Sequence, residues 1–278
     1  MGIKNNKKDK SQQLRSDFIR QLVQNRKIYP NPSPILKNNI PMKIVQFWDN
    51  LDRLPEDVKE CIESWKKVEE QGFERLLFDN EKAIAFIQQK LGLRYRLAYD
   101  KCYHPAMKSD FFRLCYIFVE GGCYIDIDDV YSGSKIQHLF CDGRLKIQPL
   151  CYDIATNNMV SPALFIKPGI NSKSWIFYFN NNPLIAACRH PIIKCALDNA
   201  TLSLEKISVN NLPEIQSTTG PGNLTNSIFG ILEENINIEQ TILIIDNWDD
   251  YAKNKWELSY RNDNRNWRLS NRIKYREF

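Results

Sequence analysis

From about residue 40 onward, short apolar runs alternate with amphipathic stretches. The runs KIVQF (43–47), FERLLF (73–78), CYIDI (123–127), RLKIQPL (144–150), PALFIKP (162–168) and TILIID (241–246) have the length and composition of buried strands. Between them, apolar residues recur at helical spacing over 55–70, 81–92, 105–120 and 190–207, and again after Gly222. Strands that alternate with helices predict an α/β fold with a central, mostly parallel sheet flanked by helices.

The first 39 residues have a different pattern. Leu14, Phe18 and Leu22 recur at helical spacing among basic residues, and the stretch YPNPSPILKNNIP (29–41) reads as a proline-rich linker. We therefore expect a basic N-terminal arm over 1–39 and one domain over 40–278. Residues 12–27 could lie as an amphipathic helix on an anionic membrane surface, or they could dock on their own domain.

Charge and cysteine usage narrow the setting. The arm holds nine lysines and arginines against two aspartates, whereas the rest of the 278-residue chain is nearly neutral. A domain without a basic face predicts no nucleic-acid partner. The eight cysteines form no C-x-x-C pair, the first residues lack the apolar core of a signal peptide, and no apolar run has the length of a membrane span. We expect a cytoplasmic protein with reduced thiols, which could also associate peripherally with the inner face of the plasma membrane.

The stretch VEGGCYIDIDD (119–129) carries the candidate chemistry. Asp126, Asp128 and Asp129 follow a predicted strand, and carboxylates this close repel unless a cation lies between them. Asp126 and Asp128 share a face if the strand continues, or converge on one ion if the chain turns at Asp128. Hard oxygen ligands favour Mg²⁺ or Mn²⁺, and the alternative is a solvated acidic loop. In open α/β sheets, ligands bind beyond the carboxyl ends of strands, where these residues lie.

A second pair lies upstream on the predicted helix 105–120. Asp110 and Arg113 are three residues apart, so they are neighbours on one helix face. Together they could bind a polyhydroxylated ligand, with the carboxylate accepting from hydroxyls and the guanidinium donating. The alternative is a surface ion pair that contributes little to stability.

In this order and spacing, Ser109-Asp110-Phe111-Phe112-Arg113 and Gly121-Gly122-Cys123-Tyr124-Ile125-Asp126-Ile127-Asp128 resemble the sugar-binding region of glycosyltransferase family 32. That family includes fungal mannosyltransferases and is related to the glucosylating domains of clostridial toxins. IPMKIVQFW (40–48), Ser64-Trp65 and Thr219-Gly220-Pro221 resemble further family segments. YAKNKWELSY (251–260) resembles a C-terminal stretch in which Asn254 replaces the usual His.

The resemblance implies a GT-A fold and a site. It implies Mn²⁺ or Mg²⁺ held by Asp126, Asp128 and Asn254, and catalytic roles for Asp110, Arg113, Asp126 and Asp128. It implies a donor held by Trp48, Asp110, Arg113, Gly122, Tyr124 and Asp126. The expected reaction transfers a hexose or N-acetylhexosamine from a nucleotide-diphosphate sugar, a UDP-sugar in preference to a GDP-sugar, with retention at the anomeric carbon. The expected acceptor is a saccharide or lipid-linked saccharide, in synthesis of capsular or lipopolysaccharide-type surface polysaccharide.

Three other functions compete with this hypothesis. The first is an effector-type glycosyltransferase that modifies a protein. The second is a non-catalytic module that binds sugar nucleotides. The third is a metal phosphohydrolase with a D-x-D nucleophile loop, which the sequence disfavours because Asp129-Val130-Tyr131 follows where a threonine is expected.

Overall fold

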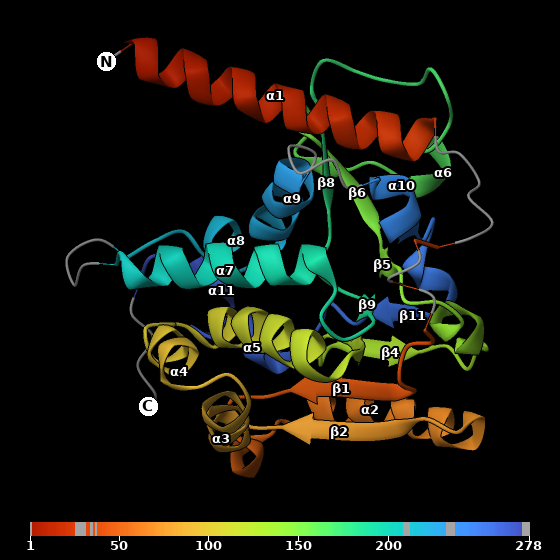
Figure 1. The fold of residues 1–278 in the computed structure, drawn as a ribbon, viewed down its shortest axis with the longest axis vertical. Coiled ribbons are helices and arrows are strands. Elements are labelled where there is room, and N and C mark those ends of the chain that lie inside the picture. The colour runs from red at the N-terminus through yellow and green to blue at the C-terminus, as the bar shows by residue number, and fades with distance from the viewer. Residues whose placement is uncertain are drawn as a thin grey trace.

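A six-stranded mixed sheet forms the centre of the protein (Figure 1). The structure is a computed structural model that describes residues 2–25, 32–33, 36, 38–207, 212–231 and 237–273. The strand order is β10-β5-β9-β3-β1-β2, with β9 antiparallel to both of its neighbours and the other pairs parallel. The strands are β1 (Lys43–Phe47), β2 (Glu74–Phe78), β3 (Gly122–Tyr124), β5 (Leu145–Ile147), β9 (Leu184–Ala186) and β10 (Ile242–Ile244). The predicted α/β class is confirmed.

Helices cover the sheet, as the apolar periodicity predicts. Helix α5 (Pro105–Glu120) packs beside α7 (Pro191–Glu205), and the main core cluster lies between them and the sheet (Figure 1). Both helices begin with a His-Pro pair, and the buried side chains of His104 and His190 cap them by accepting from the N–H groups of Ala106 and Ile192. Proline fits the first helical position because its missing N–H would have no partner there.

Further elements complete the fold. The remaining α-helices are α1 (Gly2–Gln24), α2 (Glu56–Ser64), α3 (Asn80–Lys90), α4 (Leu93–Asp100), α6 (Pro162–Phe165), α8 (Ile215–Thr218), α9 (Pro221–Gly230), α10 (Ile238–Thr241) and α11 (Trp267–Ser270). Two small antiparallel sheets pair β11 (Ala252–Asn254) with β4 (Asp129–Tyr131), and β6 (Pro149–Asp153) with β7 (Asn158–Met159) and β8 (Trp175–Phe179). Short 3-10 turns join several of these elements.

The structure corrects three details of the sequence prediction. Residues 162–168 are not a strand: Pro162 starts the short helix α6, and only Phe165 of that helix is fully buried. The cap of α3 is Asp79 and not Asn80, because the Asp79 carboxylate accepts from the N–H of Lys82 at 2.8 Å. The strand expected over 123–127 ends at Tyr124, which places both aspartates of the D-x-D in the turn that follows.

Helix α1 docks on its own domain. It lies across β8 and α9, with Ile19 and Val23 fully buried in the main core (Figure 1). The Ser16 hydroxyl accepts from the N–H of Phe177 at 3.0 Å, and Gln24 donates to the carbonyl of Phe165 at 2.9 Å. Of the two alternatives for residues 12–27, the structure supports intramolecular docking for residues 12–25, because protein covers Ile19 and Val23, although Leu14 is exposed. Of the proline-rich stretch 29–41, residues 29–31, 34–35 and 37 lie outside the described residues.

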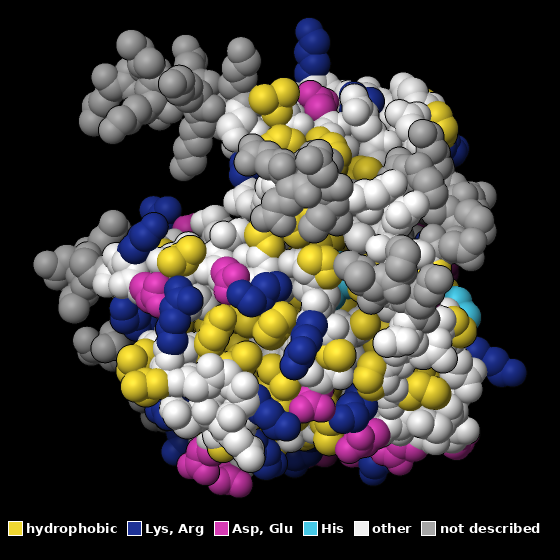
Figure 2. Space-filling model, viewed as in Figure 1, with side chains coloured by type: hydrophobic (Ala, Val, Ile, Leu, Met, Phe, Trp, Pro, Cys, Tyr) yellow, Lys and Arg dark blue, Asp and Glu magenta, His cyan; other side chains and the backbone are white. Residues whose placement is uncertain are grey.

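Lys/Arg and Asp/Glu side chains are interspersed over the face drawn in Figure 2. All eight cysteines lie in the described part of the chain, and none of them forms a disulfide there. Among the described helices, none combines the length and the apolar character needed to cross a bilayer.

Candidate active site

A pocket of about 480 Å³ opens at the carboxyl ends of β1 and β3. Because β9 is antiparallel, the segment that enters it, Asn180–Asn182, reaches the same edge of the sheet. Charged and amide side chains line the pocket: Asp49, Asp110, Arg113, Asp126, Asp128, Asn180, Asn181, Gln216, Asn254, Arg261, Arg265, Asn266 and Arg268. Of the residues predicted to act, six meet here: Trp48, Asp110, Arg113, Asp126, Asp128 and Asn254.

The double glycine turns the chain from helix to strand. Gly121 ends α5 with φ +70°, and a Cβ there would lie 2.8 Å from the backbone nitrogen of Cys188. Gly122 has φ +106° and packs equally closely against the carbonyl of Lys43. Gly122 and Tyr124, predicted to contact the donor, are not among the residues that line the pocket. Gly122 admits the neighbouring strand, and the Tyr124 ring centroid lies 4.5 Å from the guanidinium of Arg113; that either residue contacts the donor stays a prediction.

A buried ion network links α5 to the D-x-D turn. Arg113, with a side chain only 4% exposed, lies 3.0 Å from the Asp110 carboxylate and 2.8 Å from that of Asp126. It also donates to the carbonyl of Asn181 at 2.7 Å. The pair is therefore no surface ion pair, and its polar atoms are largely committed to other protein groups. Arg113 positions Asp126 instead of presenting a free fork to the pocket.

Burial changes the protonation of this network. It raises the pKa of Asp126 to about 7, although the guanidinium of Arg113 opposes the rise. Burial likewise raises the pKa of Asp110, against the same guanidinium. For Arg113, burial alone would lower the pKa, but Asp126 and Asp110 raise it overall, so the guanidinium stays charged.

Two asparagines hold the network in place, and the sequence prediction missed them. Asn181 donates to Asp110 Oδ1 at 2.8 Å. Asn182 accepts from the N–H of Asp126 and donates to Asp129 Oδ2, both at 2.9 Å. The run of three asparagines directly before a short apolar segment was the available signal, because amides at a strand end can serve several donors and acceptors.

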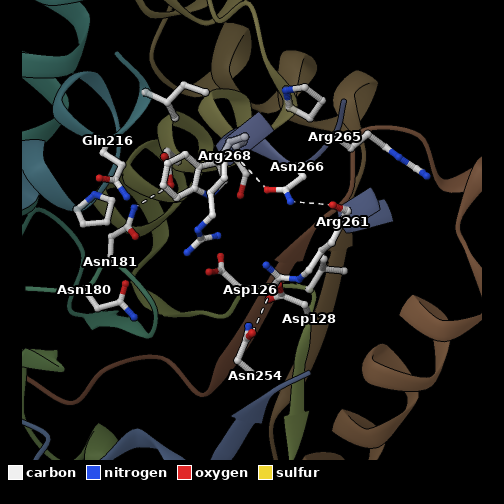
Figure 3. A pocket seen from close by; sticks show the side chains of 18 of the residues that line it. Asp126, Asp128, Asn180, Asn181, Gln216, Asn254, Arg261, Arg265, Asn266 and Arg268 are labelled. Atoms are coloured by element: carbon white, nitrogen blue, oxygen red, sulfur yellow. Dashed lines mark hydrogen bonds and ion pairs between the residues drawn. The ribbon is translucent and has the colours of Figure 1, made fainter. Parts of the chain in front are cut away.

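Asp128 is held from the C-terminal part of the chain. Its Oδ2 accepts from the hydroxyl of Tyr260 at 2.8 Å and is ion-paired with Arg261 (Figure 3). Its Oδ1 is buried and has no hydrogen-bond partner among the described residues. A buried carboxylate oxygen without a partner is costly, so this atom marks a place where a ligand would be stabilised.

Asp129 belongs to the scaffold. Its carboxylate accepts from the indole N–H of Trp248 at 2.8 Å and from Asn254 at 3.4 Å, in addition to Asn182. Burial raises the pKa of Asp129 to about 6, Asp128 adds to the rise, and these hydrogen bonds oppose it. Trp65, of the Ser64-Trp65 pair, also supports this residue, because its indole N–H donates to the Asp129 carbonyl at 2.9 Å.

The chemistry of the pocket fits a hard divalent cation. Asp126, Asp128 and Asn254 would hold it, and Asp128 supplies the unpartnered oxygen. Across the described residues no cluster of three His, Cys, Asp or Glu side chains forms a closed metal site. Two carboxylates and an amide oxygen suit Mg²⁺ or Mn²⁺, because proteins commonly bind these ions through one or two carboxylates together with substrate phosphates.

The C-terminal segment 256–268 contributes a further wall, and its arginines and Trp267 lie beyond the predicted motifs. Trp256, Tyr260, Arg261, Arg265, Trp267 and Arg268 all line the pocket. Ser270 anchors this segment through a 2.8 Å hydrogen bond with His104, the cap of α5. Trp48 packs edge-on against Tyr260, with ring centroids 5.3 Å apart, so it contributes to both pocket and core.

A family model matches the segment that carries the DXD turn, and known proteins are similar to this chain over different shares of its length. Residues 55–142 match the family described as "Glycosyltransferase sugar-binding region containing DXD motif". The "Uncharacterized glycosyltransferase L373" of Acanthamoeba polyphaga mimivirus is 30% identical over 92 residues, which are 33% of this chain and 36% of that protein. The solved structure of "PaToxG Glycosyltransferase" is 17% identical with a TM-score of 0.46, over 82% of this chain and 78% of that one.

The family match contains both halves of the predicted motif, Asp110–Arg113 and Asp126–Asp128. For residues 55–142 it confirms the prediction of a DXD sugar-binding region of the glycosyltransferase type. The chain matches about a third of the length of the curated relative.

Proposed function

We propose that this protein is a metal-dependent glycosyltransferase of the family 32 type with a GT-A fold. It transfers a hexose or N-acetylhexosamine from a nucleotide-diphosphate sugar, a UDP-sugar in preference to a GDP-sugar. One observation carries the proposal: the DXD turn of a sugar-binding region opens into a pocket, where a buried oxygen of Asp128 lacks a partner.

The residues divide the work. Asp128 and Asn254 bind the cation, and Asp126 binds it or a hydroxyl of the donor. When bound, the cation stabilises the charge that grows on the departing diphosphate. Arg113 keeps Asp126 in place, and Asp110 is fixed in turn by Asn181 and Arg113. The site therefore acts mainly by orientation and charge stabilisation. We assign no pocket side chain as a covalent nucleophile. The proposed mechanism is therefore front-side attack by the acceptor hydroxyl, with retention of configuration at the anomeric carbon.

The aromatic side chains of the pocket suit a saccharide acceptor. Tyr178, Trp256 and Trp267 line the pocket. Their rings offer flat apolar surface, and the neighbouring amides offer hydrogen bonds, a combination typical of small-molecule sites. We extend the proposal to a saccharide or lipid-linked saccharide acceptor in surface-polysaccharide synthesis. Transfer of the sugar to a protein would instead indicate an effector-type glycosyltransferase.

The test is a screen of nucleotide sugars with Mn²⁺, in which release of nucleoside diphosphate is measured. We expect turnover with one sugar class, and a loss of at least about 100-fold in the Asp128→Asn variant, because the cation loses a charged ligand. Asp52→Asn is the matched control, since Asp52 is exposed and lies outside the pocket.

Three results would contradict the proposal. If Asp128→Asn turns over as fast as Asp52→Asn, the DXD turn is not the catalytic site. If the wild type binds nucleotide sugars but hydrolyses and transfers none of them, it is a binding module. Hydrolysis of simple phosphate esters without any nucleotide sugar would instead indicate a phosphohydrolase.

A further inference from the structure

Arg261 lies where the proposed cation ligands meet. Its guanidinium is ion-paired with Asp128, and the same nitrogen donates to Asn254 Oδ1 at 3.1 Å (Figure 3). The two charged side chains are 12% and 9% exposed, so little water surrounds the pair. Arg261 thus contacts two of the three side chains that would hold a divalent cation.

The guanidinium and a divalent cation cannot share this place. Oδ2 of Asp128 and Oδ1 of Asn254 already accept from Arg261, whereas the buried Oδ1 of Asp128 has no hydrogen-bond partner in the part of the chain that the structure describes. Like charges at contact distance repel strongly where water is scarce. A cation that binds Asp128 and Asn254 must therefore displace the guanidinium.

Arg261 has a second surface to rest on. Its guanidinium lies 4.1 Å from the ring centroid of Trp256 and 5.5 Å from that of Tyr260. Its Nε is buried without a hydrogen-bond partner among the described residues, so the guanidinium is not fully satisfied where it is. Ring faces attract a guanidinium, and Arg is well suited to bind a diphosphate through its planar fork.

We propose that Arg261 is an internal competitor of the divalent cation. The cation that arrives with the donor displaces the guanidinium from Asp128 and Asn254, and the guanidinium then pairs with the diphosphate. The inference rests on the proposed function for the identity of the ligand, a nucleoside diphosphate group. Its consequence is coupling: the cation alone binds weakly, and cation and diphosphate strengthen each other's binding equally.

The test measures Mn²⁺ binding by the full chain without nucleotide, by electron paramagnetic resonance of the free ion. We expect Arg261→Gln to lower the Kd for Mn²⁺ by about tenfold or more, because the competing charge is gone. Arg261→Lys keeps a positive charge and should stay near the wild type. Asp128→Asn in the Arg261→Gln background should abolish the gain. Added UDP should tighten Mn²⁺ binding more in the wild type than in Arg261→Gln.

Several outcomes would overturn the inference. The inference is wrong if the wild type and Arg261→Gln bind Mn²⁺ with the same Kd. It is also wrong if Arg261→Gln still binds Mn²⁺ more tightly than the wild type when Asp128 is replaced by Asn. Absence of Mn²⁺ binding in every variant would contradict it too, because removing the guanidinium should leave the cation ligands free to bind. Circular dichroism verifies that each variant is folded. Failure of the glycosyltransferase proposal is seen separately, as absence of nucleoside diphosphate release from every donor, and it leaves the Mn²⁺ comparison intact.

Discussion

At the scale of single residues, the site depends on charges that protein groups hold in place before any ligand arrives. Arg113 pairs with Asp110 and Asp126 in a nearly dry environment, and Asn181 and Asn182 supply further hydrogen bonds. Such networks are costly to break, because removing one member leaves the others buried and unpaired.

Arg113→Met should therefore unfold at a clearly lower urea concentration. We expect a loss of about 3–5 kcal/mol in the free energy of unfolding, since two buried carboxylates lose their cation. Adding Asp126→Asn should recover part of the loss. Arg94→Met removes an exposed arginine paired with Glu205, and it should leave the midpoint unchanged. Equal urea midpoints for Arg113→Met and Arg94→Met would contradict this prediction.

At the scale of elements, the sequence predicts most of the helix and strand bounds that neighbouring residues determine. The bounds of α5 are visible from Pro105 and Gly121, and β1 is visible as a compact apolar run. The sequence does not show that the strand after Gly121 stops at Tyr124. That end depends on Asn182 and Trp248, which reach the turn from more than fifty residues away.

The same distinction applies to the site. Asp126, Asp128 and Asn254 carry a recognisable spacing, and the structure brings them into one pocket. Arg261 carries no such signal. It reaches the pocket because β11 pairs with β4 directly behind the turn, and a tertiary pairing of this kind cannot be deduced from local sequence.

The capped start of α7 predicts a pH dependence of stability. Burial lowers the pKa of His190 from 6.5 to about 4; the charge of Lys146 adds to the fall, and the hydrogen bond with the Thr241 carbonyl opposes it. The unfolded chain therefore binds a proton at a higher pH than the folded chain. Stability from this group is fully present above about pH 6.5 and is lost as the pH falls towards 4, by up to about 3 kcal/mol.

Urea unfolding at pH 7.5 and pH 5, compared between the wild type and His190→Asn, isolates this loss. The raised pKa values of the buried Asp126 and Asp129 act in the opposite direction, but both proteins share them. His190→Asn can still cap the helix and should reduce the difference between the two pH values. Some dependence should remain, because burial also lowers the pKa of His104. The exposed His138→Asn variant should behave as the wild type. If His190→Asn loses as much free energy of unfolding between pH 7.5 and pH 5 as the wild type does, the buried ring is not the cause of the pH dependence.

At the scale of the whole molecule, α1 is part of the folded unit. Ile19→Ala should lower the free energy of unfolding by about 2–5 kcal/mol, because it removes buried apolar volume between α1 and the core. Leu14→Ala, on an exposed position of the same helix, should change it by less than about 0.5 kcal/mol. Thermal and urea unfolding of both variants test this. Comparable small effects would mean that the helix contributes little and that its apolar face is available to lipid.

The antiparallel strand β9 has a practical consequence for anyone who shortens this chain. It lies between β3 and β5 and hydrogen-bonds to both, yet it comes from residues 184–186, well beyond the recognisable family region at 55–142. A fragment confined to residues 55–142 would leave the edge of β3 that faces β9 without hydrogen-bond partners, and an unpaired strand edge promotes aggregation. Expression trials should therefore retain the chain at least through the C-terminal wall at Ser270.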